Sequence, residues 1–202
     1  MSMAPRRSLL SILALASALA LSACGGNAQP SAPGTPIATE TASPTPTVDT
    51  RPTPANSTGP GRNIPKPELP EAAKQNTKEG FEAFTQYWFD TAAYSLATGD
   101  KTALEAISAD DCKLCNGYIA DVASGGWTVG ITWTTSGFVS DLTLDPLGQA
   151  VGYFMLDESP SQWYDATGKL TNDRSGVSNG RPKAIYASFI DGAWMARQLG
   201  QA

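Results

Sequence analysis

Large apolar side chains recur at steps of three and four residues between Glu71 and Thr98. The members of this series are Phe81, Phe84, Trp88, Ala92 and Leu96. This spacing predicts a long helix with one buried stripe, because side chains three and four residues apart share a helix face. Pro70 suits the first turn, Asn76-x-x-Glu79 is an alternative start, and Gly99 predicts the end.

Two shorter helices are predicted between Gly99 and Gly125. Asp100 is placed to cap the first of them, which covers Thr102–Ile107. The motif Ser108-x-x-Asp111 resembles a capping box and predicts the start of the second helix, which ends near Gly125.

From Trp127 onwards the sequence becomes rich in β-branched and aromatic residues, which is typical of strands. Strands are expected over residues 127–135, 138–144, 150–156 and 162–165. Residues 171–181 are polar and contain glycine, so they are predicted to form a mobile loop. Asp191-Gly192, between the apolar runs 184–190 and 193–199, is a strong hairpin signal. Helices followed by an antiparallel sheet predict an α+β fold.

The first 23 residues have the pattern of a signal peptide. Arg6 and Arg7 precede an apolar run from Leu9 to Leu21, which is shorter than the about 20 residues that a membrane-spanning helix needs. The pattern therefore predicts export from the cytoplasm. The basic pair also resembles a twin-arginine signal, so both export routes stay open.

The signal ends in Leu21-Ser22-Ala23-Cys24, which resembles a bacterial lipobox. This resemblance implies that the Cys24 thiol receives a diacylglyceryl group and that Cys24 becomes the mature N-terminus. It further implies a lipid-anchored protein on the extracytoplasmic face of the cell membrane, with the membrane as a partner. The alternative is a soluble secreted protein in which Cys24 lies near the cleavage site by chance.

Residues 24–65 are predicted to form a disordered tether after the lipidated cysteine. They contain nine prolines, many Thr, Ser and Ala residues, and no aromatic residue. Such a segment cannot bury enough apolar surface to offset the entropy lost on ordering, and it favours an extended chain. All 17 aromatic residues of the protein lie between Phe81 and Trp194. The folded α+β domain is therefore expected to cover residues 66–202.

Charge and residue types exclude several classes of function. The chain has 202 residues and a formal net charge of −5, which disfavours binding to the phosphates of nucleic acids. It has no histidine, which excludes Ser-His-Asp catalysis, Cys-His catalysis and His-ligated zinc. No motif in the sequence indicates a cofactor or a catalytic constellation.

Cys112 and Cys115 form the one local motif whose side chains could carry out a reaction or form a covalent bond. With Cys24 lipidated, they are an even pair in an oxidising compartment, and side chains three residues apart near a helix start share a face. A structural disulfide is therefore expected. One alternative is a thioredoxin-like redox centre, which the adjacent acids Asp110 and Asp111 disfavour because they oppose thiolate formation. Another is a metal site, for which two thiolates are too few.

Two sets of motifs resemble known proteins. The order of elements and the terminal hairpin Phe189-x-x-Gly192-x-Trp194 resemble the nuclear transport factor 2-like (cystatin-like) cone fold, in which three helices pack on a curved antiparallel sheet. The second set comprises Pro67-x-x-Pro70, Phe81-x-x-Phe84-x-x-Tyr87-Trp88, Tyr94, Thr98-Gly99-Asp100 and Ser108-x-x-x-Cys112-x-x-Cys115. This set resembles a group of actinobacterial lipoproteins that share a domain of unknown function (number 6318). The resemblance implies a location and a fold, and no activity.

The resemblance to a cone fold implies a cavity between the first helix and the sheet. Trp88, Tyr94 and Tyr186 are the candidate pocket residues. The preferred function is that of a non-catalytic envelope lipoprotein, whose α+β domain binds a partner protein or a small ligand without a cofactor. The alternatives are a small-molecule enzyme that uses an inward-facing Asp opposite a Tyr, and a CxxC redox protein. Asp141 is on a predicted strand, but it lies near the strand end, where solvated turn carboxylates are common.

Overall fold

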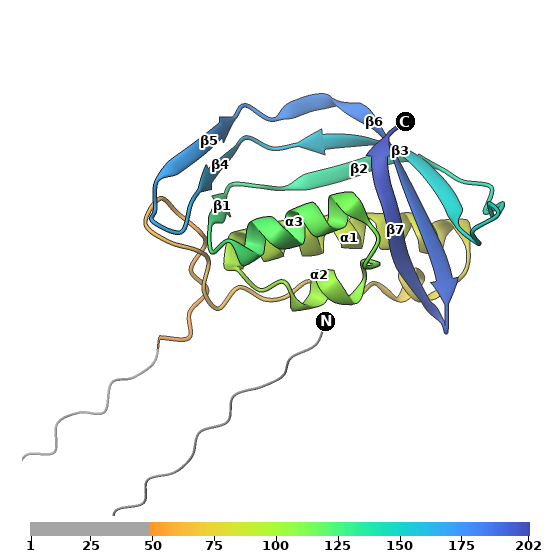
Figure 1. The fold of residues 1–202 in the computed structure, drawn as a ribbon, viewed down its shortest axis with the longest axis horizontal. Helices are drawn as coiled ribbons and strands as arrows, with labels where there is room; N and C mark the ends of the chain where they lie inside the picture. Colours follow the sequence, from red (N-terminus) through yellow and green to blue (C-terminus); the bar gives the residue numbers. More distant parts are fainter. Residues whose placement is uncertain (1–48) are drawn as a thin grey trace, which may run out of the picture. The chain divides into compact units, whose positions relative to one another are not determined.

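The structure is a computed structural model, and it describes residues 49–202. The predicted signal peptide, Cys24 and residues 25–48 of the predicted tether lie outside the described residues. Residues 49–202 form three α-helices, one short 3-10 helix and two antiparallel sheets (Figure 1). This arrangement agrees with the α+β class predicted from the sequence.

The folded domain begins before residue 66, earlier than the predicted boundary. Within residues 51–65, Gly61 donates its N–H to the carbonyl of Ala97 at 2.8 Å. The carbonyl of Asn56 accepts a hydrogen bond of 2.8 Å from the indole of Trp127. Composition alone did not indicate that residues 51–65 are ordered, because hydrogen bonds to other elements hold this segment and it has no core of its own.

The helical half of the domain follows the predicted order. It consists of the 3-10 helix η1 (Glu71–Lys74) and the helices α1 (Lys78–Thr98), α2 (Thr102–Ala106) and α3 (Lys113–Ala123). The Thr77 side chain accepts the Gly80 N–H at 3.0 Å, so α1 starts there and the predicted long helix is divided between η1 and α1. Helix α3 begins at Lys113, later than the capping-box motif suggested, because Cys112 is its N-cap.

Seven strands form two sheets within residues 49–202. They are β1 (Trp127–Val129), β2 (Trp133–Val139), β3 (Ala150–Glu158), β4 (Ser161–Tyr164), β5 (Leu170–Arg174), β6 (Val177–Ile190) and β7 (Ala193–Gln201). The larger sheet has the order β2-β3-β6-β7, and the smaller has the order β1-β4-β5. Asp191 and Gly192 both have positive φ, 52° and 81°, which suits a tight turn between twisted strands and confirms the predicted hairpin.

The polar segment 171–181 forms strands instead of the predicted mobile loop. Its first part lies in β5, which pairs with β4, and its second part begins β6, which pairs with β3. All five residues of β5 are exposed, so their polar character reflects solvent contact on both faces. Backbone pairing with a neighbouring strand orders such a segment without an apolar face. The strand predicted over 127–135 is likewise divided, between β1 and β2 of different sheets.

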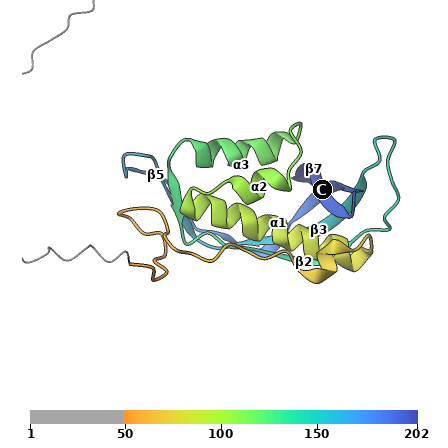
Figure 2. The same cartoon turned by 90° about the horizontal axis from the view of Figure 1, so that it is seen from below.

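The core lies between α1 and the inner face of the larger sheet. Figures 1 and 2 show the three α-helices side by side on that face, with α1 next to the strands. Phe81 stacks on Trp194 with ring centroids 4.6 Å apart, and the fully buried Trp88 donates its indole N–H to Ser108 at 2.9 Å. The predicted buried stripe of α1 is therefore confirmed. None of the helices in residues 49–202 has the length and apolar composition that crossing a membrane requires.

Candidate functional site

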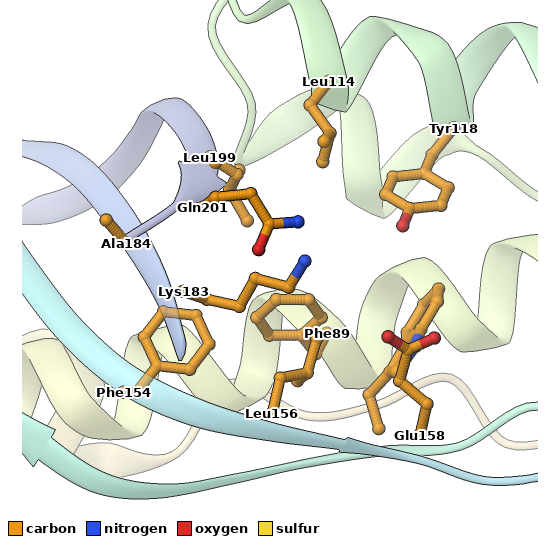
Figure 3. A pocket seen from close by; sticks show the side chains of 12 residues that line it. Phe89, Leu114, Tyr118, Phe154, Leu156, Glu158, Lys183, Ala184, Leu199 and Gln201 are labelled. Carbon is orange, nitrogen blue, oxygen red and sulfur yellow. The ribbon is translucent and has the colours of Figure 1, made fainter. Parts of the chain in front are cut away.

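A pocket of about 190 Å³ opens between α3, α1 and the inner face of the larger sheet (Figure 3). Its lining consists of Phe89, Leu114, Tyr118, Trp133, Phe154, Leu156, Glu158, Lys183, Ala184, Leu199, Gly200 and Gln201. Most of these side chains are aromatic or aliphatic. The polar ones are Tyr118, Glu158, Lys183 and Gln201. An apolar interior with a few polar groups is the usual composition of a ligand site.

The floor of the pocket is built by the alternation of side chains along the strands. Phe154, Leu156 and Glu158 are two residues apart on β3, so they point to the same face of the sheet. Lys183 on β6 is directly opposite Phe154, and Gln201 on β7 is directly opposite Lys183. The register therefore places Lys183 and Gln201 beside Phe154, at one end of the floor, and Glu158 at the other.

Helix α3 forms the roof of the pocket. Leu114 and Tyr118 are four residues apart, so they project from one face of the helix. Leu114 lies within the loop that Cys112 and Cys115 close, and these two fully buried cysteines are joined as a disulfide. The Cys112 sulfur also accepts the Cys115 N–H at 3.3 Å. The cysteine pair predicted from the sequence is thus at disulfide distance, and it holds the first turn of α3 over the pocket.

Aromatic rings in edge contact form the walls. Phe89 on α1 meets Trp133 and Phe154 with ring centroids 5.7 Å and 5.6 Å away. Tyr118 meets Trp133 at 5.4 Å. Contacts of this geometry contribute about 0.5–1.5 kcal/mol each beyond the burial of area. The walls therefore hold their shape through contacts among the lining residues themselves.

Tyr118 contributes a hydroxyl group with a raised pKa to the pocket lining. Burial raises the pKa of Tyr118, the negative charge of Glu158 raises that pKa further, and Arg174 opposes the shift. Figure 3 shows the Tyr118 hydroxyl and the Glu158 carboxylate directed toward one another from roof and floor. Because its pKa lies above the usual value near 10, Tyr118 is a neutral hydrogen-bond donor at pH 7.

Comparison with known proteins identifies the family. The sequence profile of a family of unknown function (DUF6318) matches residues 51–200. The chain belongs to this family. The crystal structure of the intermembrane space region of chloroplast protein ARC6 is similar to this DUF6318 chain, with a TM-score of 0.45 and 12% sequence identity. That similarity covers 62% of this chain and 96% of the ARC6 chain. No curated protein sequence matches the DUF6318 chain.

The pocket residues suggested by the sequence do not line this pocket. They are Trp88, Tyr94 and Tyr186. Trp88 points into the core, and its neighbour Phe89 faces the pocket instead, because consecutive helix residues are roughly 100° apart. The Tyr94 hydroxyl approaches Asp100 at 3.4 Å beyond the end of α1. Tyr186 on β6 is half-buried and is paired with Val151 of β3, away from the lining residues Phe154, Leu156 and Glu158.

Asp141, which the sequence places near a strand end, does not line this pocket. Asp141 is exposed, and its carboxylate accepts the Thr143 N–H at 2.9 Å. This hydrogen bond lowers the pKa of Asp141 from its usual value. The acid in the pocket lining is Glu158. Residues 49–202 also hold no cluster of three or more His, Cys, Asp or Glu side chains arranged for a metal ion.

Sequence reasoning missed all four polar residues of the pocket in this DUF6318 chain. The alternation Phe154-x-Leu156-x-Glu158 was a usable signal, since it places a carboxylate on the same face as two apolar side chains. Lys183 carries no such local signal. Its place opposite Phe154 follows only from the pairing of β3 with β6.

Proposed function

We propose that this DUF6318 chain is a lipid-anchored, extracytoplasmic binding protein whose domain holds a small molecule with one apolar ring and does not transform it. The pocket beneath α3 is the observation that carries the proposal. Its aromatic walls and its volume of about 190 Å³ decide the size of the ligand. An engineered apolar cavity of about 150 Å³ in another protein binds benzene, whereas drug-sized ligands need pockets of about 300–1,000 Å³. One substituted ring fits these limits.

The anchoring part of the proposal rests on the sequence before the domain. Cys24 in the lipobox-like motif would carry the lipid, and residues 25–48 would separate it from the folded part. Extended at about 3.1 Å per residue, these 24 residues reach roughly 75 Å. The pocket would then open into the space outside the membrane, and the lipid would supply the membrane contact.

The fold type is also part of this proposal. We assign the domain to the nuclear transport factor 2-like cones because helices cover one face of an antiparallel sheet and the chain ends in a long hairpin. In such an arrangement the helix layer and the inner face of the sheet together enclose the ligand. The pocket beneath α3 occupies this position.

Native mass spectrometry of the full chain, purified from its host, tests the binding function. We expect a retained small molecule of single-ring size. A Leu114→Trp variant should lose it, because the larger side chain fills the pocket from the roof. Leu147→Trp is the matched control, since Leu147 is 77% exposed and lies outside the pocket. An empty wild-type chain whose melting temperature no single-ring compound raises would contradict the proposal.

Intact-mass analysis of the mature chain tests the anchor separately. We expect a mature N-terminus at Cys24 that carries the mass of a diacylglyceryl group, and no such mass in a Cys24→Ala variant. A mature chain that starts elsewhere and carries no lipid would refute the anchoring part and leave the binding function untouched.

A further inference from the structure

Lys183 and Glu158 carry opposite charges, line the pocket from different positions along its floor, and form no ion pair with each other. Lys183 is opposite Phe154 in the β3–β6 register, and Glu158 is four residues further along β3. Four residues of strand place the two backbone positions roughly 13 Å apart. The ion pairs within residues 49–202 are Asp49 with Arg51, Glu71 with Lys74, and Lys101 with Glu105. Lys183 and Glu158 are both half-buried and belong to none of them.

Each charge has a polar neighbour that completes a recognition site. Figure 3 shows the Lys183 amine and the Gln201 amide close together, and the Tyr118 hydroxyl facing the Glu158 carboxylate. The first pair offers donors suited to an anion. The second pair offers one donor and one anionic acceptor, which suits a hydroxyl or amino group that both donates and accepts.

Aromatic walls formed by Phe89, Trp133 and Phe154 line the same pocket as these polar groups. A half-buried charge among apolar side chains is favourable when a ligand group replaces the lost water with a charge-assisted hydrogen bond. The best complement is therefore a flat ring with unlike groups at opposite positions. Its anion would face Lys183, and its donor would face Glu158.

We infer that the pocket selects a single-ring aromatic carboxylate with a hydroxyl or amino group at the opposite end of the ring. Lys183 and Gln201 bind the carboxylate, and Glu158 and Tyr118 bind the hydroxyl or amino group. The inference rests on the proposed function, that the pocket holds one ring, and adds the chemistry by which the ring is chosen.

Calorimetric titration of the full chain in phospholipid nanodiscs tests this selection, because detergent would compete for an apolar pocket. The probe is 4-hydroxybenzoate. It is compared with 4-methoxybenzoate, which lacks the donor, and with 4-hydroxybenzyl alcohol, which lacks the anion. We expect each comparison compound to bind the wild-type chain roughly tenfold to a hundredfold more weakly, the range that follows from losing one hydrogen bond to a charged group.

Substitutions assign the two ends of the ligand. Lys183→Met should weaken 4-hydroxybenzoate binding by at least about tenfold and leave 4-hydroxybenzyl alcohol binding unchanged. Glu158→Gln should weaken 4-hydroxybenzoate and leave 4-methoxybenzoate unchanged. Lys169→Met is the matched control, because Lys169 is an exposed cation outside the pocket, and it should bind all three compounds as the wild-type chain does.

The outcomes separate the inference from the proposed function. If the wild-type chain binds all three compounds equally, the ring-binding function stands and the selection by charge is refuted. If Lys183→Met binds 4-hydroxybenzoate as tightly as wild type does, the assignment of the carboxylate end is overturned. If none of the three compounds binds and no other single-ring compound raises the melting temperature, the proposed function fails as well.

Discussion

Gly152→Ala is a sharp test of how tightly the core is packed. Gly152 is a buried glycine on β3. A methyl group there would lie 2.5 Å from Cε2 of Phe138 and closer still to its Cζ, and 3.3 Å from Cε1 of Phe81. Real Cβ atoms do not approach other atoms this closely, so either the Phe138 ring or the strand must move.

The surroundings of Phe138 limit that movement. Phe138 is 6% exposed and meets Phe81 edge-on at 5.2 Å, and Phe81 in turn is stacked on Trp194 at 4.6 Å. Adding a methylene to a packed core costs about 1–3 kcal/mol, and replacing glycine regains about 0.4–1 kcal/mol from the unfolded chain. We therefore expect Gly152→Ala to lower the free energy of unfolding by about 1–2 kcal/mol.

Urea unfolding of the full chain, followed by tryptophan fluorescence, measures this difference. Gly200→Ala is the matched control, because Gly200 lies in β7 with nothing within 4 Å of the added methyl group, and it should be neutral or slightly stabilising. Adding Phe138→Leu to Gly152→Ala should cost less than the sum of the two single changes. Equal stability of Gly152→Ala and Gly200→Ala would refute the claim that the core around Gly152 is tightly packed. It would mean that the Phe138 ring can move away from the added methyl group at no cost.

Three further predictions concern other parts of the domain. Replacing both Cys112 and Cys115 by serine should lower the free energy of unfolding by about 2 kcal/mol, as the loop has four residues, and an unchanged urea midpoint would contradict this. Trp127→Phe removes the donor to the Asn56 carbonyl, so hydrogen exchange in residues 53–62 should accelerate, and unchanged protection would argue against that anchor. Tyr118 keeps its proton in the folded state after unfolded tyrosine has lost it near pH 10, so stability should fall as pH rises from about 10 to the raised pKa. In urea titrations above about pH 10, the free energy of unfolding of Tyr118→Phe should decrease less steeply with pH than that of the wild-type chain. An unchanged pH dependence would show that other groups cause the decrease.

Local signals predicted much of the fold correctly. The apolar stripe of α1 and the Asp191-Gly192 turn depend on neighbours a few residues away, so periodicity and turn chemistry were sufficient. Helix α2 was located for the same reason, although its N-cap is Lys101 and not the predicted Asp100; the Asp100 carboxylate accepts the Thr102 N–H at 3.0 Å. Family membership also followed from short motifs spread along α1 to α3, and it is confirmed over residues 51–200.

The sequence wrongly predicted that two polar segments without an apolar face would be irregular. Residues 51–65 and 171–181 have the composition of a tether and a loop, yet both are ordered by hydrogen bonds to distant elements. A backbone N–H or carbonyl is the same in every residue type apart from proline, so composition does not show whether it finds a partner. The sheet register and the docking of the segment decide that.

The sequence by itself determined the α+β class, the core stripe, the terminal hairpin and the cysteine pair, because each depends on short-range spacing. Lipidation at Cys24 stays a prediction from the sequence, and it depends on a short motif and on no tertiary contact. Only the tertiary structure decided the pocket, since Tyr118, Glu158 and Lys183 lie on three different elements and meet through helix docking and strand register. Contacts between residues far apart in the chain arise from packing, and packing is a property of the whole fold.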